Sequence, residues 1–128
     1  MERVIWSKCD ANNWCPFMGM NLKHKSFEGL EGIYVIWYEN VVVAVGQGAI
    51  RERLQAHLHD KEFQAFRSKY LLVTWCTISQ YIRAGAVKFL CEQYHPLLRG
   101  LCPDVPPIPV NLPFSKRSIY LYGSPRGS

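Results

Sequence analysis

The sequence predicts a single α+β domain built on a small three-stranded antiparallel sheet flanked by helices. Two β-branched and aromatic runs, 32–38 and 41–46, are separated by Glu39-Asn40, which is typical of a tight turn between antiparallel strands. A third apolar run, 70–78, has the continuous hydrophobicity of a buried central strand. These three runs therefore predict one sheet.

Two helices are expected to pack against this sheet. The first, 49–59, carries an apolar stripe at helical spacing that consists of Ile50, Leu54 and Leu58. The second, 80–95, follows Ser79, a favourable N-cap residue, and stops before Pro96. The order strand, strand, helix, strand, helix agrees with the predicted α+β class.

The length of 128 residues predicts one domain, 1–128, with its core at about 30–98. Residues 1–28 show no clear period and are interpreted as an irregular extension that packs its aromatic side chains on the domain. Residues 100–128 are rich in proline, which predicts an extended wrap. Within that wrap, 118–122 could add an edge strand, and 123–128 is expected to be a frayed tail.

Charge and cysteine content suggest the environment and the partners. The net charge of +5 and the pI of about 9.0 permit a polyanionic partner, although the basic residues are scattered. We expect no membrane association, because no apolar run approaches the ~18 to 20 residues that span a bilayer and Met1–Asp10 lacks signal-peptide character. Five cysteines without framework-like spacing favour reduced thiols and hence a cytoplasmic protein.

A glycine-rich segment after the second strand predicts an anion site. Gly46 and Gly48 favour a turn that leaves backbone N–H groups free, so Gly46, Gln47 and Gly48 are the predicted phosphate-binding residues. In the following helix Arg53 and His57 are four residues apart and therefore project from the same face.

Taken together, these residues resemble the catalytic half of the GIY-YIG nuclease superfamily. The resemblance rests on Gly32-Ile33-Tyr34, on Gly46-Gln47 at the end of the second motif, on Arg53-Leu54 and on His57, and it covers about residues 30–98. The chain departs from the family pattern at Ala44, which replaces the second tyrosine, and in a loop about one residue shorter before Arg53.

The resemblance implies a divalent-metal-dependent DNA endonuclease, or a degenerate descendant of one, that hydrolyses phosphodiesters with Mg²⁺ or Mn²⁺. It assigns Tyr34 to the attacking water and Arg53 to the phosphate, with His57 as a third catalytic residue. The alternative for His57 is a helix-surface histidine. The alternative for the whole protein is a catalytically inactive module that binds nucleic acid or a protein partner.

The metal-binding glutamate of the family has no direct counterpart. Counted back from Pro96, its position falls on Val87. Glu92 is the only acid in this helix, and it lies about 140° around the axis from Val87, so it is a ligand only if the register shifts. A solvated Glu92 on the outer helix face is the alternative. We therefore expect weak or absent metal-dependent cleavage.

The hairpin turn sets which residue faces Ala44. A three-residue loop would place Tyr34 opposite Ala44, whereas a two-residue loop would place Val35 there. Tyr38 lies on the same strand face as Tyr34 and could partly refill the space above Ala44, where the family has a tyrosine.

The individual cysteines point to no metal site. A zinc site at Cys9, Cys15 and His24 is disfavoured by its spacing relative to free thiols. Cys76 and Cys91 are interpreted as small core residues.

Overall fold

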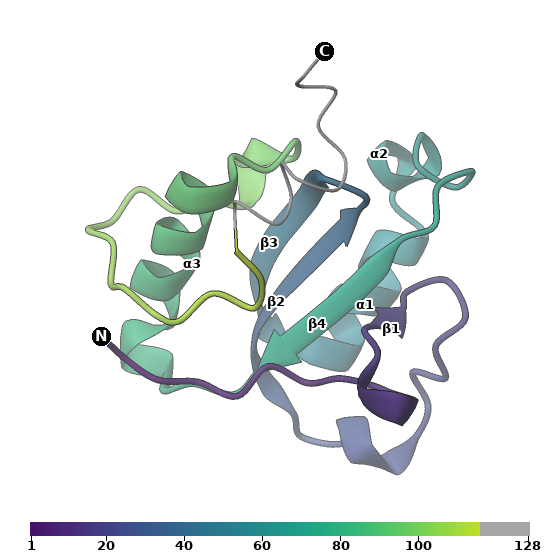
Figure 1. Cartoon of the computed structure of the whole chain (residues 1–128), viewed down its shortest axis with the longest axis horizontal. Coiled ribbons are helices and arrows are strands. Elements are labelled where there is room, and N and C mark those ends of the chain that lie inside the picture. Colours follow the sequence, from purple (N-terminus) through teal and green to yellow (C-terminus); the bar gives the residue numbers. More distant parts are fainter. Residues whose placement is uncertain (116–128) are drawn as a thin grey trace.

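The computed structural model describes residues 1–115 and has the predicted α+β class (Figure 1). Its sheet contains four antiparallel strands in the order β1-β4-β2-β3. Their bounds are β1 (Cys15–Pro16), β2 (Glu31–Tyr38), β3 (Val41–Ala49) and β4 (Leu72–Cys76). The three predicted strands are confirmed, and the prediction of only three is wrong.

The additional strand comes from the N-terminal extension. β1 is two residues long and pairs Cys15 with Val73 and Pro16 with Leu72. A two-residue strand that contains proline carries no periodicity, so its pairing depends on contacts with the rest of the fold.

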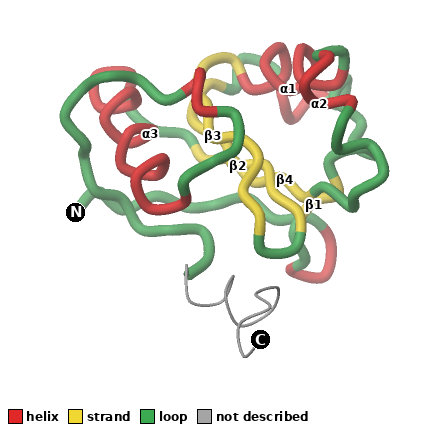
Figure 2. The backbone as a smooth tube through the Cα atoms, turned by 90° about the horizontal axis from the view of Figure 1, so that it is seen from above, coloured by secondary structure: helices red, strands yellow, loops and turns green. Residues whose placement is uncertain are grey.

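Helices cover both faces of the sheet, α3 on one side and α1 with α2 on the other (Figure 2). The bounds are α1 (Ile50–Leu58), α2 (Lys61–Gln64) and α3 (Gln80–Tyr94), with short 3₁₀ turns η1 (Asp10–Asn12), η2 (Lys25–Phe27) and η3 (Arg99–Leu101). Both predicted helices are confirmed, as is the N-cap, since the Ser79 side chain accepts a hydrogen bond from the backbone N–H of Tyr81. Within residues 1–115 no helix is long and apolar enough to cross a membrane.

The sheet separates two apolar clusters. Alternate residues of β2 point to opposite faces, as the pleat requires. The α1-face core includes Tyr34, Ile36, Val43, Ala44, Ile50 and Leu54. The α3-face core includes Ile33, Val35, Val45, Ala86, Val87 and Leu90.

A β-bulge sets the register of the hairpin. The turn is the two-residue Glu39-Asn40, yet the pairing shifts between Ile36 and Trp37, so that Ile36 lies opposite Ala44 and Tyr34 opposite Gly46. Both registers considered from the sequence are therefore wrong. The extra residue in β3 is Val43, which faces the α1 side together with its neighbour Ala44. The Tyr38 ring packs 6.0 Å from the Phe66 ring.

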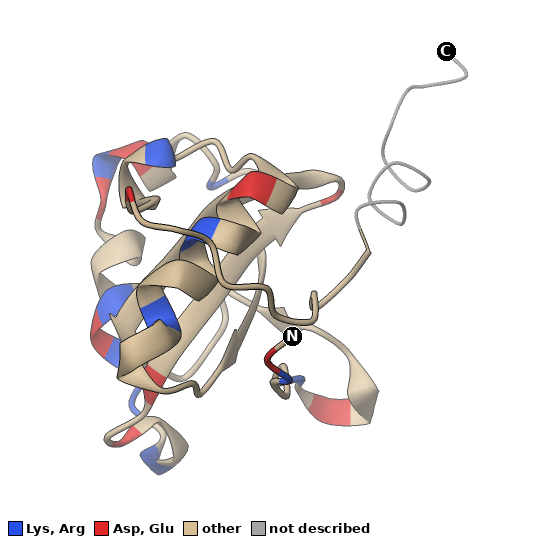
Figure 3. Cartoon of the chain, turned by 90° about the vertical axis from the view of Figure 1, so that its left-hand side faces the viewer, with Lys and Arg blue, Asp and Glu red and all other residues tan. Residues whose placement is uncertain are grey.

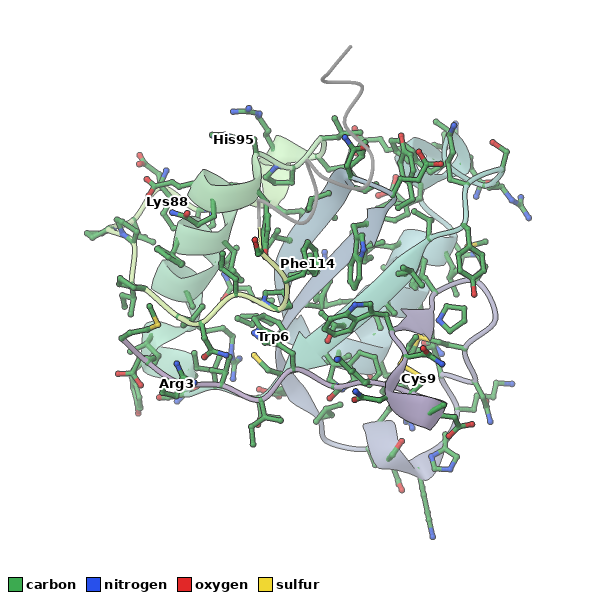
Figure 4. All side chains as sticks on the ribbon, viewed as in Figure 1. Arg3, Trp6, Cys9, Lys88, His95 and Phe114 are labelled. Carbon is green, nitrogen blue, oxygen red and sulfur yellow. A yellow bond between two sulfur atoms is a disulfide. The ribbon has the colours of Figure 1, made fainter. Side chains whose placement is uncertain are left out.

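The N-terminal extension is irregular and packs its aromatic side chains on the domain, as predicted. The rings of Trp14 and Trp37 are 5.4 Å apart, and Phe17 is buried. Figure 4 shows Trp6 and Phe114 in the same region, where the two extensions meet over the sheet. The indole N–H of Trp6 donates to the carbonyl oxygen of Asn111 at 2.9 Å.

The proline-rich segment forms the predicted extended wrap as far as it is described. The backbone N–H of Ile108 donates to the Gly85 carbonyl oxygen on α3 at 2.9 Å, and Val110 is buried. The strand considered at 118–122 and the tail at 123–128 lie outside the described residues.

The prediction of five reduced thiols is wrong. Disulfides join Cys9 to Cys15 and Cys91 to Cys102. Sequence spacing did not reveal either pair, because a turn near η1 and the chain reversal after α3 bring the partners together. Cys76 is a buried free thiol, as expected for a small core residue, and burial raises its pKa to about 12.

The disfavoured zinc arrangement is also excluded by the structure. Cys9 and Cys15 are consumed by their disulfide, and the His24 ring accepts from the Ser26 backbone N–H as the cap of η2.

Candidate functional site

Tyr34 on β2 and His57 on α1 form a buried polar pair between the sheet and α1. The Tyr34 hydroxyl oxygen lies 2.6 Å from Nε2 of His57. Tyr34 is 0% exposed and His57 is 3% exposed. The alternative of a helix-surface histidine is therefore wrong, and two of the three predicted catalytic side chains are in direct contact.

Gly46 makes room for the Tyr34 ring. A Cβ atom at Gly46 would lie within 3.0 Å of three atoms of the Tyr34 phenol, including its hydroxyl oxygen. The glycine is thus required by the close approach of the ring across the hairpin.

The predicted glycine turn does not exist, because β3 continues to Ala49 and α1 begins at the next residue. Gly46, Gln47 and Gly48 are strand residues that pair with Tyr34, Ile33 and Gly32, respectively. Gly48 has a φ of +128°, and a Cβ there would lie 3.3 Å from Cγ of Arg53. None of these three predicted phosphate-binding residues lines the cavity beside Arg53.

Burial and Arg53 control the protonation of the pair. Burial, assisted by the Arg53 charge and opposed by Asp60, lowers the pKa of His57 to about 4. Burial also raises the pKa of Tyr34, although a hydrogen bond from Arg53 and its charge act in the opposite direction. Both groups are therefore neutral at neutral pH.

One hydrogen bond joins the two neutral groups, between the Tyr34 hydroxyl and Nε2 of His57, and the histidine tautomer sets its direction. The other ring nitrogen, Nδ1, is buried without a hydrogen-bond partner in residues 1–115.

A cavity of about 230 Å³ lies beside this pair. One wall consists of residues from α1, from the N-cap of α2 and from α2, namely Arg53, Ala56, His57, Asp60 and Glu62. The other wall is segment 97–101, which includes η3 and lies next to β3 (Figure 1). Arg53 and His57 therefore line one cavity, whereas Tyr34, which was expected to line it with them, is fully buried behind them and interacts with both.

Arg53 is the cation best placed to bind an anion in this cavity. Its side chain is half-buried and interacts with Tyr34, and it forms no ion pair within the described part of the chain. A guanidinium without a carboxylate partner keeps donors for an oxyanion such as phosphate.

The residues predicted for a metal do not join this site. Glu92 is exposed on α3, near the end of the helix and beyond its two basic residues (Figure 3). Val87 is buried in the α3-face core, on the side of the sheet opposite Tyr34. The carboxylates that do line the cavity are those of Asp60, the N-cap of α2, and Glu62, in α2 itself. Sequence reasoning missed them because it placed the metal-binding carboxylate on the later helix.

The donor set does not fit a complete metal centre. Residues 1–115 contain no group of three histidine, cysteine, aspartate or glutamate side chains arranged to hold a metal ion. Asp60 is also occupied in part, because its side chain accepts from the Glu62 backbone N–H as the N-cap of α2.

Comparison with known proteins leaves the site to be interpreted from its own geometry. No family model, no curated protein and no solved structure matches this chain.

Proposed function

We propose that the chain is a GIY-YIG-like domain that binds the phosphate backbone of nucleic acid, most simply DNA, and has weak or no cleavage activity. The observation that carries this proposal is Arg53, which lines the cavity beside Tyr34 and His57 without a carboxylate partner in residues 1–115. The net charge of +5 supports a polyanionic ligand.

The Tyr34–His57 pair acts in this proposal as a buried support for Arg53. The Arg53 guanidinium interacts with the Tyr34 hydroxyl, and this interaction restricts its orientation. A water-activating role for Tyr34 would require access to its hydroxyl, yet the residue is fully buried and its hydroxyl is hydrogen-bonded to His57. The arrangement therefore favours binding over hydrolysis.

Metal-dependent cleavage is the second candidate function, and one observation favours it. Asp60 and Glu62 line the same cavity as Arg53, and Mg²⁺ is commonly held by one or two carboxylates together with waters and a substrate phosphate. Because these residues do not form a complete metal centre by themselves, we assign no step to Mg²⁺ or Mn²⁺.

A protein partner remains the alternative to nucleic acid. The two disulfides argue against the predicted cytoplasmic location, because disulfides are typical of oxidising compartments.

The test is a titration of a fluorescent DNA duplex at several salt concentrations between about 50 and 200 mM. We expect Arg53→Ala to reduce the slope of log affinity against log salt by about 1, and to weaken different duplex sequences equally. Arg67→Ala is the matched control, because Arg67 is exposed and does not line the cavity.

Two results would contradict the proposal. Absence of binding at low salt would instead favour the protein-binding module. Strong cleavage of the same duplex by the same preparation, dependent on Mg²⁺ or Mn²⁺, would establish the nuclease, and Glu92→Gln would then show whether Glu92 contributes.

A further inference from the structure

A second guanidinium lines the cavity from the wall opposite Arg53. Arg53 comes from α1, whereas Arg99 begins η3 in segment 97–101. Two arginines that are 46 residues apart in the sequence thus border one space of about 230 Å³. At ~30 Å³ for each water, this space has room for a phosphate group and some of its hydration.

The side chain of Arg99 is available for a ligand. Arg99 is exposed, and its side chain makes no hydrogen bond or ion pair with the described residues. Only its backbone is engaged locally, where its carbonyl oxygen accepts from the Cys102 N–H at 3.0 Å.

Three contacts fix the segment that carries Arg99. The backbone N–H groups of Leu97 and Leu98 donate to the carbonyl oxygens of Val42 and Val43 at 3.1 and 2.9 Å. Val43 is the bulge residue, which has no partner in β2. The Cys91–Cys102 disulfide then ties the far end of the segment to α3.

We propose that Arg99 is a second phosphate contact, which completes with Arg53 a cleft for one backbone phosphate, and that the Cys91–Cys102 disulfide holds Arg99 in this position. This inference rests on the proposed nucleic-acid function. Arginine suits the role because its planar donors match the oxygens of a phosphate. Asp60 and Glu62 line the same space, so the second guanidinium offsets negative charge that would otherwise repel a phosphate.

The experiment repeats the salt titration with Arg99→Ala, Arg53→Ala and the double variant. Each single variant is expected to lower the salt slope by about 1 and the double variant by about 2. Affinity at low salt should fall about five- to tenfold for each. Lys88→Ala on α3 removes one positive charge away from the cavity and should leave the slope unchanged.

The results separate this inference from the proposed function. A loss with Arg53→Ala but none with Arg99→Ala would overturn the role of Arg99 and leave the proposed function intact. No loss with either variant would overturn both. An equal loss with Lys88→Ala would also overturn it, because Arg99 would then contribute only general charge.

The disulfide is tested by combining substitutions. The Cys91→Ser/Cys102→Ser variant should lower the slope of log affinity against log salt by the same amount as Arg99→Ala. Adding Arg99→Ala to this variant should lower the slope no further. Arg53→Ala should retain its full effect in that background. A full additional loss from Arg99→Ala in the disulfide-free protein would show that the disulfide does not position Arg99. The circular dichroism of each variant confirms that the compared proteins are folded.

Discussion

The two faces of the sheet are built from alternate residues of the same strand, yet they differ in polarity and closure. On the α1 face, Tyr34 is hydrogen-bonded to His57 and borders the site of Arg53 and an open cavity. On the α3 face, Ile33 and Val35 pack against an apolar helix surface, and the extended segment around Ile108 covers that helix. Chemistry is therefore concentrated on one face, while the other serves to close the core.

This comparison explains why the metal position of the resembled family fails here. Val87 belongs to the closed α3 face, and Glu92 lies on the outer surface of the same helix. A carboxylate on α3 would have to cross the sheet to reach Tyr34. The acids near Arg53 come instead from the start of α2, Asp60 at its N-cap and Glu62 in its first turn.

The largest expected difference between the faces comes from adding one methyl group to each. Gly46→Ala places a Cβ against the fully buried phenol of Tyr34, which is held between strands and hydrogen-bonded. We expect a loss of about 3 kcal/mol or more in the free energy of unfolding, measured by urea denaturation.

Gly85→Ala is the matched substitution on the α3 face. Its Cβ would lie 2.5 Å from both Cγ1 and Cδ1 of Ile108, so this side chain and the extended segment that carries it must shift, while alanine gains about 1 kcal/mol over glycine in a helix. The gain in the helix offsets part of the overpacking cost, so we expect a smaller net loss than at Gly46, of about 1 to 2 kcal/mol. Equal losses at the two glycines would contradict the proposed rigidity of the Tyr34 site.

The second-largest expected effect is a pH dependence of the free energy of unfolding that comes from His57 on the α1 face. The pKa of His57 is about 4 in the folded protein and about 6.5 when unfolded, so between these values only the unfolded state gains the proton. The free energy of unfolding should fall as the pH decreases from about 6.5 to 4, by roughly 2 to 3 kcal/mol in total. This contribution is absent above pH 7, where both states are neutral.

His57→Gln should remove this dependence, since the glutamine amide can still form a hydrogen bond with Tyr34 but does not titrate. The measurement is the urea midpoint of the unmodified protein minus that of His57→Gln at each pH in that range. Carboxylates titrate in both proteins, so their contribution drops out of the difference. A parallel pH profile in the variant would mean that His57 is not the group responsible.

The smallest expected effect concerns the acids on the two faces. Glu62→Gln removes a negative charge beside Arg53 and Arg99 and should strengthen DNA binding by about twofold without metal. Glu92→Gln makes the same change on α3 and should have no effect. Weaker binding of the Glu62 variant in Mg²⁺ would instead indicate that this carboxylate recruits a cation.

Local pattern was sufficient to predict most of the fold. β2 and β3 were predicted by β-branched runs around Glu39-Asn40, and α3 by its cap at Ser79. The fourth strand was missed because Cys15–Pro16 gains its structure only from its pairing with β4. The bulge at Val43 was missed because nothing in the apolar run 41–45 marks the extra residue.

The sequence predicted residues of only one wall of the candidate site. The four-residue spacing of Arg53 and His57 and the position of Tyr34 in the motif predicted three side chains that the structure brings together. Segment 97–101 could not be placed, because its position depends on the bulge and on a disulfide between residues that the sequence does not pair. Cys91 and Cys102 on either side of Pro96 were the available signal.

The bulge has a practical consequence for protein engineering. The register of the hairpin changes at Val43. Between Val43 and the turn, the residue numbers of a pair add up to 79, as in Tyr38–Val41. Beyond Val43 they add up to 80, as in Tyr34–Gly46. A graft of this hairpin into another scaffold must therefore carry Val43 with it. A graft whose pairing is counted outward from Glu39-Asn40 without the bulge would place Tyr34 opposite Val45, whose side chain lies on the other face of the sheet. Such a hairpin would have the correct length but would lack the space that Gly46 provides for the tyrosine ring.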